Sequence, residues 1–555
     1  MNSIPPNLSL PSPALTHTSL TPAWRDRDQT RATALSLSMI IPLCWGLLGL
    51  WAGKDGGWDL LNYHWYNPYA FLNDRLGFDL GVGHHATYYN PFLDIPLYLA
   101  GEYLPGSGVG FLLSFCQGLN FPLLFWLSWA LFSPLPPRQR LALSAITAFT
   151  SMTGAGALME LAGVAHDNIT SLGVLAALLI IVNHYQTLTT GNCIAAGGWA
   201  GLAGLLAGVT AGLKLTTATY ALGLGGALLF IPACFSRRLL LAFSCAIGGI
   251  AGLALGGGYW MHELWQFSGS PFFPYFNDLC HSPLLSNASY KDERFIPRDL
   301  LTKIFFPFFF SFNSFRVAEW YFRDVRILTA FVVLPCSALW GLTGKAGRAC
   351  QTNGTWIAAG PGRFLVVAAA ISYAAWLWMF CIYRYLLPLE MLTPLLLAVA
   401  LGWLPWSNRW RATGLLTLLL ISQAMVRMDF DARKPWGDRY MEVTAPTITP
   451  DEQAMVLMTG YEPMSFIIPF FPPSIPFIRI EGYLASPHEP STGLTAIMRQ
   501  RVEEHRGALY VLIHPHERDS APKALSAYNL NLDISSCRTV PSNVTIPLEF
   551  CRVHR

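Results

Sequence analysis

Long apolar runs recur along most of this 555-residue chain, and they constrain its fold more than any other feature. A membrane-spanning helix needs about 20 apolar residues, whereas a transmembrane β-barrel shows short alternating segments. Only 12% of the residues are charged, against roughly a quarter in soluble proteins. The sequence therefore predicts a polytopic α-helical membrane protein with about eleven spans, near residues 33–53, 107–132, 139–161, 168–186, 194–212, 215–233, 239–258, 325–343, 364–383, 386–405 and 412–428.

The placement of Lys and Arg predicts the orientation of the spans, because short cytoplasmic loops carry a positive excess. Arg25, Arg138, Arg237, Arg363 and Arg409 stand in alternate connections, which share one side if the N-terminus is cytoplasmic. An odd number of spans then places the C-terminus outside. We expect three regions: a disordered cytoplasmic tail over 1–32, a transmembrane domain over 33–428, and an extracytoplasmic domain over 429–555.

The same topology places two long loops outside, over residues 54–106 and 259–324. The C-terminal region alternates strand-like and helix-like runs, which indicates a small α/β domain. Cys537 and Cys551 lie in this region and are able to pair if it is extracytoplasmic. The net charge of +3, without a dense basic run, gives no indication of nucleic acid as a partner. Glycines four residues apart near 197–212 and 248–256 predict close helix packing.

Isolated ionisable residues stand at several of the predicted outer turns. They are Asp59 after the first span, His166 and Asp167 in "GVAHDNITS", Lys214 in "AGLKLTT", and Arg384 with Tyr385 in "CIYRYLLPLE". Each has an ordinary local explanation: an interfacial carboxylate, a helix N-cap, or a basic side chain that reaches the interface. Their shared side favours a functional interpretation, because ionisable groups at membrane depth usually serve function.

The segment "HHATYYNPFLDIPLYL", residues 84–99, adds His84, His85, Asn90 and Asp94. Histidines beside carboxylates are able to bind a divalent metal, but a metal needs several convergent ligands. A divalent metal is therefore a candidate cofactor. Because spacing alone does not show convergence, no residue is assigned as its ligand.

Two carboxylates, two cations and many aromatic side chains at one surface suit a reaction with an anionic, lipid-linked donor. A carboxylate is able to take the proton of an acceptor hydroxyl. Lys and Arg are able to hold the phosphate of the leaving group. Histidine and aromatic rings are able to pack against a sugar or an isoprenoid chain.

The order of these motifs resembles the GT-C glycosyltransferases, which take sugars from polyprenyl-phosphate donors and include the protein O-mannosyltransferases and the lipid A aminoarabinose transferase. "WDLLNYHWYNPYAFL" is similar to the acidic motif after their first span, and "HDNITSLGVLAALLII" to their second acidic turn. "GLLAGVTAGLKLTT", "YWMHELWQFSGSPFFPYFN" and "RYLLPLEMLTPLLLAVAL" are similar to later motifs. The resemblance covers roughly residues 33–405.

This resemblance implies an inverting transfer of a sugar from a polyprenyl-phosphate donor to a lipid, glycan or protein hydroxyl. It implies a bacterial inner membrane with a periplasmic C-terminal domain. Asp59 is expected to be the general base, and Asp167 to position a substrate or share that role. Lys214 and Arg384 are expected to hold the donor phosphate. The remaining substrate-binding candidates are Tyr63, His64, His84, His85, His166 and Tyr385.

Two other functions remain open at this point. A transporter or flippase of lipid-linked sugars would favour charges near the middle of broken helices. A non-catalytic membrane protein of envelope assembly would act through its C-terminal domain and would not need the two acidic residues.

Overall fold

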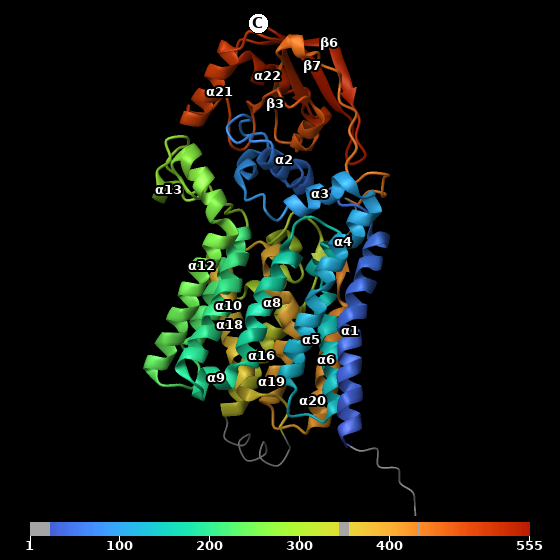
Figure 1. The fold of residues 1–555 in the computed structure, drawn as a ribbon, viewed down its shortest axis with the longest axis vertical. Coiled ribbons are helices and arrows are strands. Elements are labelled where there is room, and N and C mark those ends of the chain that lie inside the picture. The colour runs from blue at the N-terminus through green and yellow to red at the C-terminus, as the bar shows by residue number, and fades with distance from the viewer. Residues whose placement is uncertain (1–22, 343–354, 430–432) are drawn as a thin grey trace, which may run out of the picture.

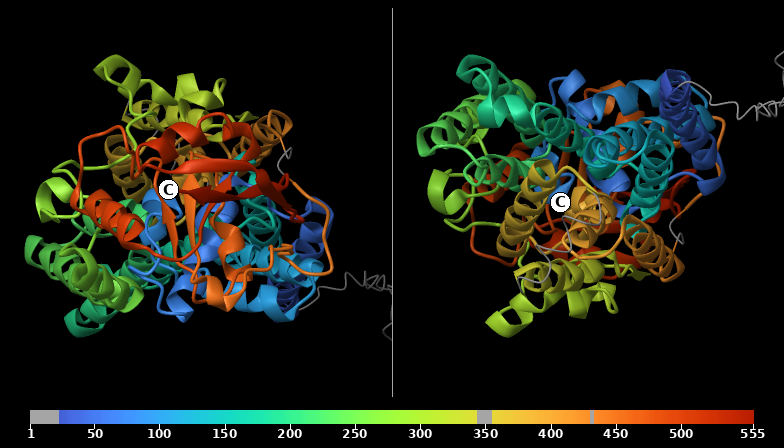
Figure 2. Two further views of the ribbon diagram at one scale, coloured as in Figure 1. Left: turned by 90° about the horizontal axis from the view of Figure 1, so that it is seen from above. Right: turned by 90° about the horizontal axis from the view of Figure 1, so that it is seen from below.

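The computed structural model describes residues 23–342, 355–429 and 433–555. It is elongated: a helical bundle occupies one part, and a sheet with flanking helices covers one end of the bundle (Figure 1). Seen from above, the strands lie across the helices (Figure 2). The three segments predicted to lie outside, 54–106, 259–324 and the C-terminal region, all contribute to this end of the molecule.

Each of the eleven predicted apolar runs overlaps a helix of the bundle. The bundle helices are α1 (Ala23–Ala52), α4 (Gly106–Gly118), α5 (Asn120–Leu131), α6 (Pro137–Met152), α8 (Asp167–Asn183), α10 (Cys193–Leu213), α11 (Ala218–Leu228), α12 (Phe235–Ser268), α16 (Arg326–Leu342), α18 (Ala359–Met379), α19 (Leu387–Gly402) and α20 (Asn408–Ala424). The second run corresponds to α4 and α5 together. Two short helices, α7 (Ala155–Met159) and α9 (Tyr185–Thr190), follow α6 and α8.

Six helical stretches among the described residues are long and apolar enough to cross a membrane. Large apolar side chains on the outer helices face outward: Met39 of α1 is 72% exposed and Leu255 of α12 is 72% exposed. In contrast, the candidate span that contains α19 is 89% buried and lies inside the bundle. These features are those of a membrane protein, while the count of eleven spans stays a prediction.

Helix α1 overlaps the last ten residues of the tail that the sequence predicts to be disordered over 1–32. Helix α1 begins at Ala23, well before the apolar run, and residues 1–22 lie outside the described part of the chain. The segment 23–32 contains Ala, Arg and Gln, which all favour a helix. Because a nucleated helix adds one hydrogen bond for each residue that it gains, α1 extends beyond its apolar part.

The prediction that glycines allow close helix packing is confirmed between α10 and α12. A Cβ atom on Gly204 would lie 2.0 Å from the carbonyl oxygen of Cys245, and one on Gly208 would lie 2.0 Å from that of Gly249. A larger residue at either position would push the two backbones apart. This contact fixes the position of Lys214, which directly follows α10.

The C-terminal region forms a mixed five-stranded sheet in the order β4-β3-β5-β7-β6. Strands β3 and β4 are parallel, as are β3 and β5, whereas β7 is antiparallel to both β5 and β6. The α/β character predicted from the sequence is present. The elements are η6 (Pro450–Glu452), β3 (Met455–Thr459), η7 (Ser465–Phe470), β4 (Phe477–Arg479), α21 (Gly493–Glu504), β5 (Leu509–Ile513), η8 (Pro515–Glu517), α22 (Ala521–Ser526), β6 (Asn531–Val540) and β7 (Leu548–His554).

Cys537 on β6 and Cys551 on β7 form a disulfide, as the sequence allowed. A two-stranded pair outside this sheet joins β1 (Phe322–Arg323) to β2 (Arg427–Met428). It ties the end of the second outer loop to the start of the C-terminal region. The second outer loop also contains α13 (Asn277–Cys280), α14 (Leu300–Ile304), α15 (Phe306–Phe310) and η4 (Ser314–Arg316).

The first outer loop lies between the bundle and the sheet (Figure 1). Arg75 pairs with Asp79 at 2.6 Å, and its guanidinium donates to the carbonyl oxygens of Pro473 and Ile475. Asp79 also accepts the backbone N–H of Phe477 at 2.8 Å. The loop is therefore part of the core beneath the sheet, and contains η1 (Leu60–His64), α2 (Tyr66–Leu72), η2 (His84–Tyr88) and α3 (Ile95–Tyr103).

We expect Arg75→Met to destabilise this end of the molecule by about 3–5 kcal/mol, because it leaves the buried Asp79 carboxylate without its cation. The matched control is Arg294→Met. Arg294 pairs with Asp292 and Glu319 but is 66% exposed, so its loss should cost less than about 1 kcal/mol. Thermal unfolding of both variants in detergent measures the difference. Equal effects would contradict the structural role given to Arg75.

Candidate functional site

An ion pair between Asp59 and Arg384 joins two distant parts of the chain at the sheet end of the bundle. Asp59 directly precedes the π-helical turn η1, and Arg384 lies in η5 (Tyr383–Leu386), the short turn between α18 and α19. The two side chains are 22% and 23% exposed. This pair is thus shielded by protein on most sides but open to solvent on one.

A second ion pair joins Lys214 to Asp167. The Lys214 ammonium lies 2.7 Å from an Asp167 carboxylate oxygen and donates to the carbonyl oxygen of Ala165 at 2.6 Å. Asp167 is the first residue of α8, and Lys214 stands between α10 and the short turn η3 (Leu215–Thr217). Asp167 is 3% exposed and Lys214 is 17% exposed, so the cation is the more accessible partner.

The ring of Tyr385 links the two ion pairs. Its centroid lies 5.6 Å from the Lys214 ammonium and 5.3 Å from the central carbon of the Arg384 guanidinium. The main chain at Tyr385 is held in turn, because the Tyr220 hydroxyl donates to its carbonyl oxygen at 2.6 Å. Both cations therefore lie beside one aromatic ring, and four predicted residues that are far apart in sequence share one site with it.

A third group of side chains lies next to these pairs. His64 Nδ1 and His166 Nε2 each lie 2.6 Å from the same oxygen of Asp94, and the two imidazole rings are 5.0 Å apart. His64 ends the turn η1, Asp94 precedes α3, and His166 precedes α8. All three are at most 4% exposed. Tyr63 packs against His64, with ring centroids 4.1 Å apart.

The local backbone explains how His166 and Asp167 serve neighbouring groups. His166 adopts a left-handed conformation with φ of +63°, which is uncommon for residues other than glycine. The chain reverses there and enters α8 at Asp167. As a result, the His166 ring contacts Asp94 while the Asp167 carboxylate contacts Lys214.

The electrostatics favour an ionised Asp59. Burial alone raises the pKa of this carboxyl, but the nearby charges, with Arg384 the strongest and Lys214 among them, hold the pKa below its ordinary value of 3.8. Burial, with the Asp59 charge, raises the pKa of Tyr63 well above its ordinary value, so that phenol stays neutral. Asp59 is therefore able to accept a proton at neutral pH.

His84 and His85 lie apart from this group. His84 Nδ1 accepts the backbone N–H of Tyr483, its Nε2 lies 3.2 Å from the carbonyl oxygen of Tyr461, and its ring stacks on Trp58. The His85 ring faces Tyr290 of the second outer loop. Burial lowers the pKa of both, that of His85 to about 4. Both ring nitrogens of His84 contact backbone groups of the C-terminal region, and in the described part of the chain Asp94 contacts His64 and His166 rather than His84 or His85.

Asp94 is the residue whose role sequence analysis missed. It appeared only as a possible neighbour of His84 and His85, yet it contacts His64 and His166 instead. A carboxylate directly before a helix that begins "IPLYL" reads as a helix cap, but Asp94 makes no side-chain cap bond. The sequence alone therefore gives no sign of another role for Asp94. The structure does, because it shows that the carboxylate leaves the helix start uncapped.

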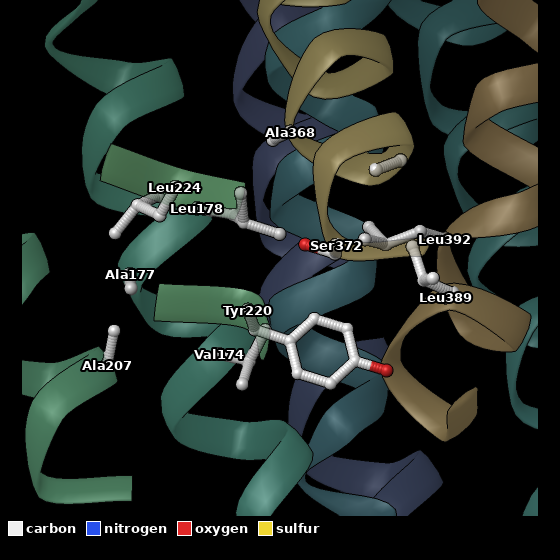
Figure 3. A pocket seen from close by; sticks show the side chains of 11 residues that line it. Val174, Ala177, Leu178, Ala207, Tyr220, Leu224, Ala368, Ser372, Leu389 and Leu392 are labelled. Carbon is white, nitrogen blue, oxygen red and sulfur yellow. The ribbon is translucent and has the colours of Figure 1, made fainter. Parts of the chain in front are cut away.

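Two cavities lie outside the charged group. One lies between α8, α10, α11, α18 and α19 and is lined by apolar side chains with Tyr220 and Ser372 (Figure 3). It measures about 10 Å³, which is room for one water at most. The other measures about 100 Å³. Its lining consists of Tyr66, Asn67, Ala70, Phe71, Asp74, Arg75, Leu76, Asp79, Thr87, Tyr259, Trp260 and Glu263, and contains none of the predicted site residues.

We expect Lys214→Met to lower the free energy of unfolding by up to about 3 kcal/mol, because it leaves the buried Asp167 carboxylate without its cation. The double variant Asp167→Asn, Lys214→Met should recover part of that loss, since it buries no unpaired charge. Thermal unfolding of both variants in the same detergent shows which of them is more stable. A double variant no more stable than the single one would contradict the pairing.

Comparison with known proteins gives one similar solved structure, the apo crystal structure of the oligosaccharyltransferase of Archaeoglobus fulgidus. The alignment has 12% identity and a TM-score of 0.44, and it covers 91% of this chain and 71% of that chain. A likeness of this size does not establish a common fold. No protein-family model matches the chain, and no curated protein sequence matches it.

Proposed function

We propose that this protein is a membrane glycosyltransferase that moves a sugar from a polyprenyl-phosphate donor to an acceptor hydroxyl. The observation that carries the proposal is the meeting of Asp59, Arg384, Lys214 and Asp167 in one partly open site at the ends of the helices. Each ion pair stabilises the turns that it joins, but that need does not require both pairs to lie beside one ring. A transfer from a phosphate donor does need a base and phosphate-binding cations together.

The two cations keep hydrogen-bonding capacity for a phosphate. Arg384 has five N–H donors, of which one contacts Asp59 and another lies 3.4 Å from the Tyr385 hydroxyl. Lys214 has three, of which two face Asp167 and the carbonyl oxygen of Ala165. The remaining donors are able to hold the donor phosphate between the two side chains, over the Tyr385 ring.

In the proposed reaction the acceptor hydroxyl oxygen attacks the anomeric carbon of the donor sugar. The bond from that carbon to the phosphate oxygen breaks, and the configuration inverts. The hydroxyl proton passes to the Asp59 carboxylate, which its surroundings keep ionised. Polyprenyl phosphate leaves, and Arg384 and Lys214 stabilise its growing negative charge.

The other predicted residues take supporting roles in this proposal. Asp167 positions Lys214, with which it pairs. Tyr63, His64, His166 and Tyr385 form the wall of the site. His84 and His85 would contact only the more distant part of a substrate, through Trp58 and Tyr290. The proposed setting is a bacterial inner membrane, with the sheet on the periplasmic side and the acceptor a lipid, glycan or protein of the cell envelope.

The first test is Asp59→Asn in the full chain, reconstituted with polyprenyl-phosphate that carries a radiolabelled sugar and with an envelope extract as acceptor source. Loss of the general base should reduce transfer by about 10²–10⁴-fold. Asp278→Asn is the matched control, because Asp278 is an exposed carboxylate of the second outer loop. Wild-type transfer by Asp59→Asn at equal expression and thermal stability would contradict the base assignment. Lipid flipping without transfer would favour a transporter.

The pH dependence gives an independent test of Asp59. Its carboxylate must be ionised to act, and activity that depends on it falls as the pH drops through its folded-state pKa, below 3.8 in the wild type. Arg384→Met removes the strongest charge that lowers this pKa, while Lys214 and His64 remain near. We expect the residual transfer of Arg384→Met to decline at a higher pH than that of the wild type or of Arg294→Met. If transfer by Arg384→Met and by the wild type declined at the same acidic pH, this arrangement would be contradicted.

A further inference from the structure

We infer that His64, Asp94 and His166 form a binding site for one transition-metal ion of the zinc class. This site is separate from the Asp59 and Asp167 pairs, and its occupancy can be measured without any sugar substrate. The inference therefore stands or fails independently of the proposed function.

The three groups converge although they come from three distant segments. His64 Nδ1 and His166 Nε2 both point at one oxygen of Asp94, at 2.6 Å each. All three ligand atoms lie within 4.8 Å of one another. Ligands of a tetrahedral zinc ion, with bonds of about 2.0–2.1 Å, are about 3.3 Å apart. Side-chain movements of less than about 1 Å would thus admit an ion between them.

The balance of charge supports a cation at this place. Asp59 is paired with Arg384, and Asp167 is paired with Lys214. Among the contacts of the described residues, Asp94 has only the two imidazoles as charged or chargeable partners. A buried carboxylate without a full cation is costly, and a divalent ion would supply that charge. A metal would also replace the two imidazole protons that a hydrogen-bonded arrangement requires.

Two further atoms show that hydrogen bonds within the protein do not satisfy this cluster. His64 Nε2 and His166 Nδ1 are buried and have no hydrogen-bond partner in the described part of the chain. The cluster is therefore not a closed structural network, because each imidazole leaves one nitrogen unused. With a metal bound at the other nitrogen of each ring, His64 Nε2 and His166 Nδ1 would carry the ring protons.

The ligand set decides the class of ion. Two imidazole nitrogens and one carboxylate oxygen suit Zn²⁺ and similar first-row ions, and three protein ligands leave a position open. Mg²⁺ and Ca²⁺ prefer oxygen ligands and suit the site poorly. The position is close to the proposed reaction centre, because His64 acts electrostatically on Asp59 and His166 directly precedes Asp167.

A second group of candidate ligands provides an internal control. Glu462, His514 and His516 also lie close together, but in the C-terminal region. His516 is exposed, and His514 Nδ1 already accepts the backbone N–H of His516. Variants in this group should therefore not change the metal content that we assign to the buried cluster.

The test uses the full chain, purified in detergent without a histidine tag, stripped with a chelator and equilibrated with Zn²⁺. We expect the wild type to retain one zinc per chain. We expect Asp94→Asn and His166→Gln each to weaken zinc binding at least 10-fold in a competitive chelator titration, while His516→Gln leaves it unchanged. No zinc in the wild type, unaltered affinity in the first two variants, or loss in His516→Gln would overturn the assignment.

A measurement on the wild type alone covers the case in which a variant does not fold. Co²⁺ added to the stripped protein should give the visible absorption of a low-symmetry, four- or five-coordinate site, and one equivalent of Zn²⁺ should abolish it. Mg²⁺ in large excess should leave the cobalt spectrum unchanged. Absence of the absorption, or its loss with Mg²⁺, would overturn the inference.

Discussion

The ion pair between Asp59 and Arg384 spans 325 residues of sequence and closes one end of the helical bundle. Both groups lie at short turns. Inside a helix of the bundle, each would be far from water. Their mutual attraction offsets much of the cost of shielding them from water. The Lys214–Asp167 pair and the Tyr385 ring complete this arrangement. It joins the starts of η1 and α8, the end of α10, and the turn between α18 and α19.

The C-terminal sheet and the first outer loop form one structural unit in the described residues. Arg75 and Asp79 connect the loop to the segment before β4, and the Ser465 hydroxyl donates to the carbonyl oxygen of Asn62 within η1. The turn that carries Asp59 and His64 therefore contacts the C-terminal region on one side, through Ser465, and the helical bundle on the other, through Arg384.

Much of this architecture could be predicted from the sequence, because apolar length and local strand patterns are properties of neighbouring residues. The helical runs and the gathering of the outer segments at one end follow from such patterns. The strand-like runs "AMVLMTG", "FIRIEGY" and "ALYVLIHP" contain β3, β4 and β5, and the helix-like run "STGLTAIMRQRVEEHRG" contains α21. Strands β6 and β7 were not distinguished, since alternation in "NLDISSCRTV" is weak and the strand is largely exposed.

The site was predicted only in part, for a physical reason. Ionisable residues at turns can be counted in the sequence, but their partners depend on how helices pack. Asp59, Asp167, Lys214 and Arg384 were singled out, yet which acid pairs with which base required coordinates. His84 and His85 are adjacent in the sequence and were therefore metal-site candidates. The structure instead brings together His64, Asp94 and His166. These residues are 30 and 72 positions apart, so no local sequence pattern predicts their contact.

The most direct test of the central claim is a structure of the full chain in a lipid nanodisc with bound polyprenyl phosphate. We expect the phosphate to lie between Arg384 and Lys214, beside the Tyr385 ring, with the Asp59 carboxylate facing the open side. A phosphate bound elsewhere, with both cations still contacting only protein groups, would contradict it.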